Sequence, residues 1–100
     1  MRNMKTLNEI RDILAQHKEE LEQKHKVKEM GIFGSYVRGQ QRKRGDLDIL
    51  VEFEEPIGLF EFMNLERYLT ELVGGKVDLV MKTALKPRIG RRIMEEVEYI

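Results

Sequence analysis

Two aspartates stand one residue apart, at Asp46 and Asp48, where a strongly β-prone segment, Leu47 to Phe53, begins. Alternate residues of a strand face the same side, about 6.5–7 Å apart, so we expect both carboxylates to point into one space. Two like charges held this close favour a cation between them, and carboxylate oxygens suit Mg²⁺. A third acid, Asp78, lies in the short apolar segment from Lys76 to Met81. We expect it to join the pair if the two strands are neighbours.

Three converging carboxylates can hold two metal ions about 3.5–4 Å apart, which activates an attacking oxygen and neutralises a leaving phosphate. Gly34 and Ser35 follow another strand candidate, Val27 to Phe33, and open a short helix or turn. A glycine there lets the backbone approach a ligand closely, amides at a helix start bind phosphate oxygens, and the serine adds a hydroxyl donor. The residues therefore predict a site for a metal-bound nucleoside triphosphate.

Each feature taken alone also has a structural interpretation. A Gly-Ser pair before a short helix is most often a turn and an N-cap, and Asp46 is compatible with a surface acid at a strand edge. Asp48 is harder to explain in this way, because acids are poor strand formers and its segment is otherwise apolar. For Asp78, a surface position on an edge strand stays open.

The spacing between the motifs is more specific than either motif. Ten residues, Tyr36 to Gly45, separate Gly34-Ser35 from Asp46-Leu47-Asp48. Four specified residues match by chance at roughly one window in 10⁵. The pattern resembles the signature of the nucleotidyltransferase superfamily of the DNA polymerase β type. The segment Gly34–Gly39 is similar to the Gly-Ser-x-Ala-Arg-Gly loop of its minimal members, the MNT antitoxins.

The resemblance covers nearly the whole chain. The segment Gly45–Val51 resembles the Ser-Asp-x-Asp-Leu-x-Val strand of the MNT antitoxins, and Asp78 stands where they keep a third acid. The segments Leu85–Ile89 and Glu98–Ile100 are similar to their C-terminal region. The chain departs from the pattern in having Gly45 in place of serine and Val37 in place of alanine.

The resemblance implies a polymerase β-like nucleotidyltransferase fold and assigns roles to six residues. Asp46, Asp48 and Asp78 are the catalytic acids and the ligands of two Mg²⁺ ions, whereas Gly34, Ser35 and Arg38 bind the ATP. MNT proteins pair with a HEPN-domain toxin, transfer AMP from ATP to a tyrosine of that toxin and release pyrophosphate, which silences it. The implied function is thus an antitoxin that is a protein adenylyltransferase and forms a hetero-oligomer with its toxin.

Two alternatives stay open: an antitoxin that neutralises its toxin by binding alone, and a nucleotidyltransferase that acts on a small molecule or an RNA end. The intact set of three acids favours an enzyme over a binder. A chain of 100 residues leaves little surface for a second dedicated pocket, which argues against the other acceptors.

The elements that must position these residues follow from the apolar pattern. Thr6 to Glu9 reads as a capping box, and the helical spacing after it predicts a helix from Leu7 to Lys24. A second amphipathic helix runs from Leu59 to Val73 and is stopped by two glycines. Pro87 opens a last helix, with apolar residues on one side of it at Ile89, Ile93, Val97 and Ile100.

Strands and helices thus alternate along the chain. The pattern predicts an α/β (α+β) fold, a small mixed sheet of three or four strands flanked by helices, with residues 1–100 forming a single domain. The near-continuous apolarity of Leu47 to Phe53 indicates a strand buried on both faces.

The composition of the chain limits which ligands and which cellular compartment are expected. The chain has 18 basic and 18 acidic residues and a formal net charge of zero, which argues against direct binding of a long nucleic acid. Its basic residues cluster in two stretches, which fits a small polyanion such as a triphosphate. We expect a solvated loop at Arg42, Lys43 and Arg44. A solvated helix face and a patch that faces the toxin or the triphosphate are equally compatible with Arg88, Arg91 and Arg92. Cysteine is absent and no apolar run is long enough for a membrane span, so we expect a cytoplasmic protein.

Overall fold

The computed structural model of the chain describes residues 5–39 and 46–100. Within these ranges it contains a four-stranded sheet with the strand order β3-β2-β1-β4. β1 pairs antiparallel with β2 and β4, whereas β2 and β3 are parallel, so the sheet is mixed as predicted. The strands are β1 (Val27–Phe33), β2 (Leu47–Phe53), β3 (Val77–Met81) and β4 (Glu98–Tyr99).

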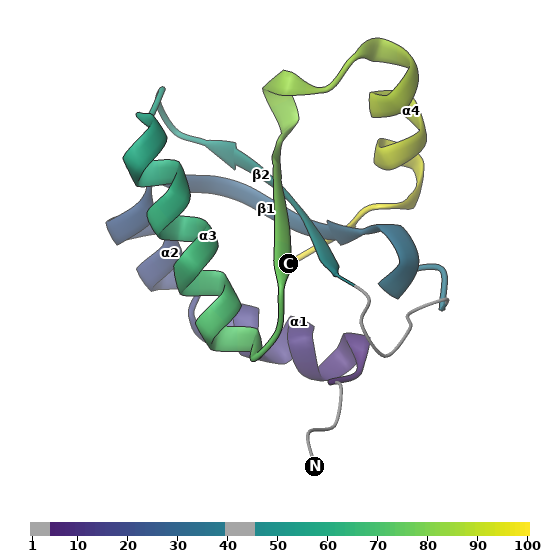
Figure 1. Cartoon of the computed structure of the whole chain (residues 1–100), viewed down its shortest axis with the longest axis horizontal. Coiled ribbons are helices and arrows are strands. Elements are labelled where there is room, and N and C mark those ends of the chain that lie inside the picture. The colour runs from purple at the N-terminus through teal and green to yellow at the C-terminus, as the bar shows by residue number, and fades with distance from the viewer. Residues whose placement is uncertain (1–4, 40–45) are drawn as a thin grey trace.

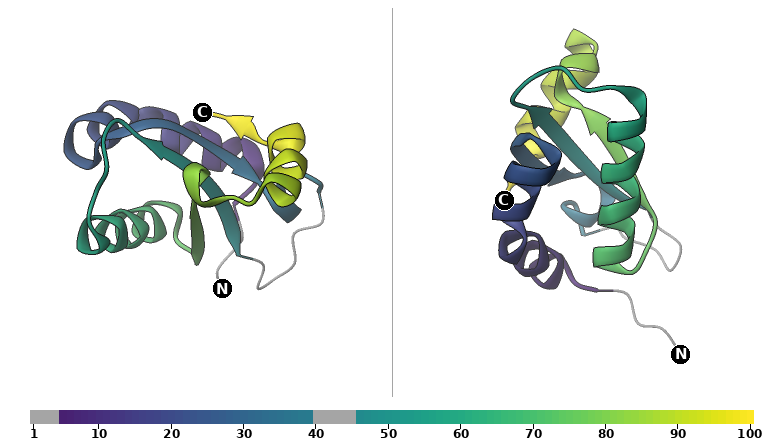
Figure 2. Two further views of the ribbon diagram at one scale, coloured as in Figure 1. Left: turned by 90° about the horizontal axis from the view of Figure 1, so that it is seen from above. Right: turned by 90° about the vertical axis from the view of Figure 1, so that its left-hand side faces the viewer.

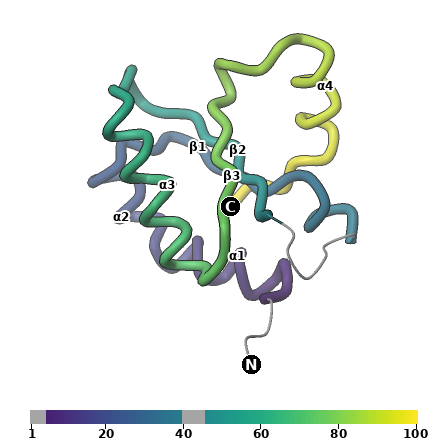
Figure 3. Tube along the Cα trace, viewed as in Figure 1, coloured from purple at the N-terminus to yellow at the C-terminus, as the bar shows by residue number. Residues whose placement is uncertain are grey.

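Helices lie on both sides of this sheet. Figures 1 and 2 show α1, α2 and α3 against one face and α4 on the other side, near the ends of β1 and β2. Figure 3 follows the backbone from β3 to α4 and back to the sheet at the C-terminus. No helix of the described residues is long and apolar enough to span a membrane. The elements are α1 (Leu7–Gln16), α2 (Lys18–His25), α3 (Leu59–Val73), α4 (Pro87–Glu96) and the short 3₁₀ turns η1 (Gly34–Tyr36) and η2 (Lys82–Ala84).

The core lies between the sheet and the first three helices. Ile10 and Leu14 of α1 meet Leu65 and Leu69 of α3 there, and all four side chains are almost fully buried. From β2, Ile49 and Val51 join this core, whereas Leu50 is buried outside it, on the opposite face. The strand is therefore buried on both faces along its middle, as its composition predicted.

Local signals set most element boundaries. The Thr6 hydroxyl oxygen accepts from the Glu9 amide at 3.1 Å and the Glu9 carboxylate accepts from the Thr6 amide at 2.7 Å, which confirms the capping box. Gly74 ends α3 with φ at 73°, a conformation that glycine adopts without steric cost. Pro87 stands in the first turn of α4, also as predicted.

The prediction of one helix from Leu7 to Lys24 is wrong, because the chain turns at His17. His17 leaves helical geometry with φ −105° and ψ 13°, and its Nδ1 lies 2.9 Å from the Ile13 carbonyl oxygen. A second helix, α2, begins directly after it. The turn lets Leu21, buried in α2, pack into the same core as α1.

The prediction that the last helix continues through Val97 to Ile100 is also wrong. α4 ends at Glu96, and the chain then forms β4 against Gly31 and Ile32 of β1. A Cβ on Gly31 would lie 2.6 Å from Val97 Cγ2, so the glycine makes room for this return.

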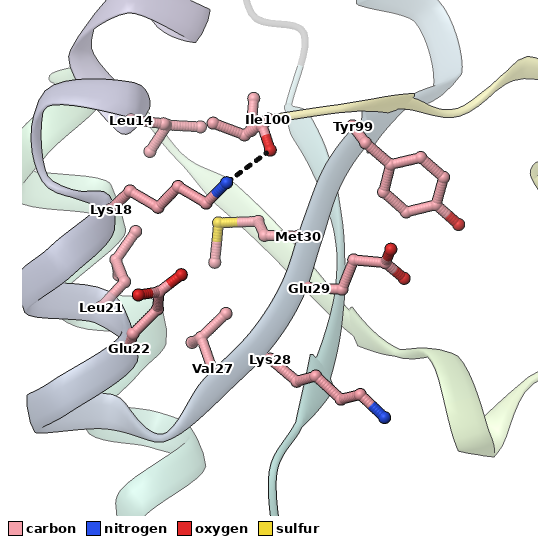
Figure 4. A pocket seen from close by; sticks show the side chains of 10 residues that line it. All are labelled: Leu14, Lys18, Leu21, Glu22, Val27, Lys28, Glu29, Met30, Tyr99 and Ile100. Carbon is pink, nitrogen blue, oxygen red and sulfur yellow. Dashed lines mark hydrogen bonds between the residues drawn. The ribbon is translucent and has the colours of Figure 1, made fainter.

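The chain end extends the β4 pairing with contacts of its own. The Ile100 amide donates to the Met30 carbonyl oxygen at 2.9 Å. Figure 4 shows Ile100 beside Leu14, with the Lys18 ammonium group donating to the Ile100 carbonyl oxygen at 3.4 Å. The chain after Glu96 thus forms a strand, although the spacing of its apolar residues fits a helix equally well. The predicted loop from Gln40 to Gly45, with Arg42, Lys43 and Arg44, lies outside the described residues.

Candidate active site

The sheet register brings the predicted acids together. Asp48 of β2 stands directly opposite Asp78 of β3, and Asp46 immediately precedes β2 on the face of Asp48. Asp46 and Asp48 are half-buried, and Asp78 is exposed. Residues 30 positions apart in the sequence therefore meet because β2 and β3 are adjacent and parallel.

The closeness of these acids affects the pKa of Asp48. Burial, the largest cause, and the nearby carboxylates of Asp78 and Asp46 together raise the pKa of Asp48 from 3.8 to about 6. The Arg38 guanidinium acts in the opposite direction, and Lys76, an exposed cation, reaches Asp46 only at 3.9 Å. Among residues 5–39 and 46–100, these two cations do not offset the effect of burial and of the neighbouring acids on Asp48.

The chemistry of the acids fits Mg²⁺, because all the donors are carboxylate oxygens and a cation would relieve their repulsion. As the side chains stand, no three histidine, cysteine or acidic side chains among residues 5–39 and 46–100 are grouped closely enough to hold a metal ion. Asp46, Asp48 and Asp78 would have to draw closer to share one.

Gly34 holds its loop close to Asp48. Its φ is +83°, and a Cβ at this position would lie 2.1 Å from Oδ2 of Asp48. Both the backbone conformation and the available space therefore require glycine. The room that its missing side chain leaves is taken by the Asp48 carboxylate.

The same loop presents an anion-binding position. The Gly34 amide donates to Glu96 Oε2 at 2.7 Å, and Arg38 Nη1 donates to Glu96 Oε1 and Oε2 at 3.0 and 3.1 Å. An amide and a guanidinium directed at one carboxylate form the kind of donor set that binds phosphate oxygens. This position lies beside Asp48, whose Cα pairs with that of Phe33.

An open cavity of about 420 Å³ connects these groups. The sheet side contributes two predicted nucleotide-binding residues, Gly34 and Arg38, and one predicted acid, Asp48. The other wall is α4, with its charged and apolar residues. The lining residues are Phe33, Gly34, Arg38, Asp48, Ile89, Arg92, Ile93, Glu95 and Glu96. The cavity therefore joins the acid site to a wall that carries both signs of charge.

The remaining predicted residues lie around this cavity. Ser35 is half-buried in η1, next to Gly34, and is not among the residues that line the cavity. Of the basic residues of α4, Arg92 lines the cavity, whereas Arg88 and Arg91 are exposed and do not line it. The structure thus distinguishes Arg92, which lines the cavity, from Arg88 and Arg91, which do not.

Sequence reasoning missed Glu96, the residue that contacts both Gly34 and Arg38. Glu96 is the last residue of α4, where the helix dipole disfavours a negative charge, so a compensating partner is expected once the helix end is known. The apolar spacing predicts a helix that continues to Ile100, so the sequence did not show this. That partner comes from a loop about 60 positions earlier, so a local pattern does not reveal it.

The comparisons with known proteins agree with this geometry. Residues 14–100 match the family model of the nucleotidyltransferase domain. Protein adenylyltransferase MntA of Thermococcus cleftensis is 50% identical over 97 residues, which cover 97% of this chain and 98% of the relative. A solved minimal nucleotidyltransferase matches with a TM-score of 0.73 and 32% identity, over 89% of this chain and 93% of the other.

Two solved complexes share the fold at lower identity. A toxin–antitoxin structure with AMP-PNP matches with a TM-score of 0.67 and 22% identity, over 92% of this chain and 69% of the other. A complex of a tri-AMPylated HEPN toxin with its MNT antitoxin, from Shewanella oneidensis, matches with a TM-score of 0.59 and 20% identity, over 92% of this chain and 66% of the other. By its sequence, its sheet and the arrangement of its acids and glycine loop, this chain belongs to the minimal nucleotidyltransferases of the MntA type.

Proposed function

We propose that this chain is a Mg²⁺-dependent protein adenylyltransferase that transfers AMP from ATP to a tyrosine of a HEPN-domain toxin and so acts as its antitoxin. One observation carries the proposal: Asp48 and Asp78 stand side by side next to a loop whose amide and arginine hold an anion. Acids that need a cation, adjacent to donors that bind an anion, suit a metal-bound triphosphate.

The reaction we propose balances without a further co-reactant. The tyrosine oxygen attacks the α-phosphorus of ATP, and a new bond forms between them. The bond from the α-phosphorus to the bridging oxygen of the β-phosphate breaks, and pyrophosphate leaves. The proton of the hydroxyl passes to a carboxylate, for which we assign Asp78, because it is the exposed member of the acid set.

The other residues bind and orient the nucleotide in this proposal. Gly34 and Ser35 donate to the β- and γ-phosphates, and Arg38 adds a positive charge to the same position. Asp46, Asp48 and Asp78 would hold the Mg²⁺ ions, which supply neutralisation of the triphosphate and activation of the attacking oxygen when bound. Arg38 already lines the cavity with Gly34 and Asp48, which supports this arrangement.

The toxin partner and the cytoplasmic setting are also part of the proposal. The toxin partner is supported by the relative from Thermococcus cleftensis, named a protein adenylyltransferase, and by the Shewanella oneidensis complex, in which an MNT antitoxin is bound to an AMPylated HEPN toxin. ATP and Mg²⁺ are both abundant in the cytoplasm. In this proposal, the partner supplies the nucleophilic hydroxyl, so the chain needs no nucleophile of its own.

The decisive experiment measures the mass of the toxin. The protein is mixed with its cognate HEPN-domain toxin, ATP and Mg²⁺ and is then removed. We expect the toxin to gain whole AMP units on a tyrosine and to stay inactive after separation. Asp48→Asn should abolish the mass shift, whereas Asp12→Asn, which changes an exposed aspartate on α1, should leave it unchanged.

Other results would overturn the proposal in different ways. A toxin that is silenced without a change in mass, and recovers on separation, identifies a binding antitoxin. AMP found on a small molecule or an RNA end, and none on the toxin, identifies a nucleotidyltransferase with another acceptor. If Asp48→Asn transfers AMP to the toxin as well as the wild-type protein does, the acids have no role in the reaction.

A further inference from the structure

We propose that Glu96 is an internal anion that occupies the phosphate-binding position of the Gly34 loop, so that a triphosphate binds by displacing it. The inference rests on the proposed function, because it concerns the same nucleotide site. It adds that ATP binding is an exchange of one anion for another, and that this exchange sets the affinity.

The contacts of Glu96 are those expected of a bound phosphate. One carboxylate oxygen accepts from the Gly34 amide at 2.7 Å, and both oxygens lie at 3.0–3.1 Å from Arg38 Nη1. The Glu96 side chain is only 24% exposed, so these contacts lie in a partly desolvated position. Such charge-assisted hydrogen bonds are stronger than neutral ones. The Gly34 amide has a single hydrogen atom, so it cannot donate fully to Glu96 and to a phosphate at once.

The position of Glu96 in its helix does not explain its presence. It is the last residue of α4, and the last turn of this helix contains no basic residue to offset the charge. A carboxylate at a helix C-terminus is unfavourable with respect to the helix dipole. The favourable interactions of Glu96 therefore come from the loop of Gly34 and Arg38, across the cavity from α4.

The same helix offers the displaced carboxylate another partner. Arg92 stands four residues before Glu96, so the two side chains share one face of α4, and both line the cavity. On displacement from the loop, Glu96 can approach Arg92 by side-chain rotation alone. Two arginines, Arg38 and Arg92, line the cavity together with three acids, Asp48, Glu95 and Glu96. In this proposal, binding of a triphosphate changes which arginine Glu96 contacts.

The test is a binding measurement with a matched control. We compare the wild-type protein with Glu96→Gln, Glu96→Ala and Glu95→Gln, and titrate each with Mg-ATP and with inorganic tripolyphosphate by calorimetry. Glu95 lines the same cavity, so Glu95→Gln removes an equal charge from it. The Gly34 amide and Arg38 Nη1 donate to Glu96, so Glu95→Gln is the control for charge without loss of these hydrogen bonds. We expect affinity to rise about tenfold in Glu96→Ala, because the site no longer has to be vacated. Glu96→Gln should be intermediate, and Glu95→Gln should change affinity less than about threefold by the general effect of charge alone.

Two binding results would overturn the inference, and a third result separates it from the proposed function. Equal gains in Glu95→Gln and Glu96→Gln mean that only the net charge of the cavity matters. Unchanged or weaker binding in both Glu96 variants, with melting curves that show a folded protein, means that Glu96 supports the loop in place of competing with the ligand. Failure of AMP transfer to the toxin, with the expected binding ratios intact, overturns the proposed function and leaves this inference standing.

Discussion

Asp48 and Asp78 occupy directly opposed positions in the parallel register of β2 and β3. Burial and the negative charges of Asp78 and Asp46 together raise the pKa of Asp48 to about 6. At neutral pH the folded chain therefore holds together carboxylates that the unfolded chain keeps apart. This cluster of acids is a local source of instability, and its effect on the free energy of unfolding can be measured.

Removing one of these charges should stabilise the protein. We expect Asp48→Asn to raise the free energy of unfolding at pH 7.5 in metal-free buffer by roughly 1 kcal/mol, a value discounted for solvent screening at a half-exposed site. Denaturant unfolding in the presence of a chelator measures the difference. Asp12→Asn, on the exposed side of α1, should show no comparable gain. Equal or lower stability of Asp48→Asn would contradict the electrostatic interpretation.

The advantage of Asp48→Asn should depend on pH with a definite sign. The pKa of Asp48 in the folded chain, about 6, is above its ordinary value of 3.8. The ionised carboxylate therefore destabilises the folded state fully above about pH 6, and this effect is lost as the pH falls toward 4. The stability difference between Asp48→Asn and wild type should shrink between pH 7.5 and pH 4. Comparing the free energies of unfolding of the two proteins cancels the titration of the groups that they share. A difference that stays constant between pH 7.5 and pH 4 would exclude the raised pKa of Asp48.

Mg²⁺ should stabilise the wild-type protein, because an ion that binds only the folded state shifts the unfolding equilibrium. We expect the melting temperature to rise with Mg²⁺ concentration and to return to its starting value when a chelator is added. Asp48→Asn should lose most of this response, whereas Asp12→Asn should keep it. Equal responses in all three proteins would point to nonspecific screening by the salt.

Gly34→Ala should be severely damaging. The new Cβ would lie 2.1 Å from Asp48 Oδ2, and the backbone would have to keep a φ of +83°. Gly74→Ala is the matched control, because its φ is +73° but its nearest contact, at 3.3 Å, is the end of the flexible Lys5 side chain. We expect Gly74→Ala to cost about 1 kcal/mol from backbone strain alone. Gly34→Ala should cost more than that in chemical denaturation and should also abolish ATP binding in calorimetry.

The acids and the loop were predictable from the sequence because their signals are local. Gly34-Ser35 and Asp46-x-Asp48 have a fixed spacing, and the apolar segments beside them specify strands. The pairing of Asp48 with Asp78 needed one further assumption, that the two strands are neighbours, and the sheet order confirms it. The chemical roles of these residues stay predictions.

The features that sequence reasoning missed all depend on long-range packing. The apolar spacing of Leu14, His17 and Leu21 continues through the turn, so the break at His17 is invisible in the periodicity. Val97 and Ile100 fit a helix by spacing, and only the open edge of β1 selects a strand there. The Glu96 contacts join residues 62 and 58 positions apart, and a single sequence does not contain that information.

The crossover from β2 through α3 to β3 also has a kinetic consequence. Parallel strands cannot pair until the whole connection between them has closed, and such non-local contacts form late in folding. Asp48 and Asp78 are adjacent only after this step, since α3 and its flanking turns separate them along the chain. A partly folded chain with α1, α2 and the β1–β2 hairpin in place would have the glycine loop beside only two of the acids. Catalytic competence would then be among the last properties acquired during folding, so a newly made chain could not modify a partner before its own sheet was complete.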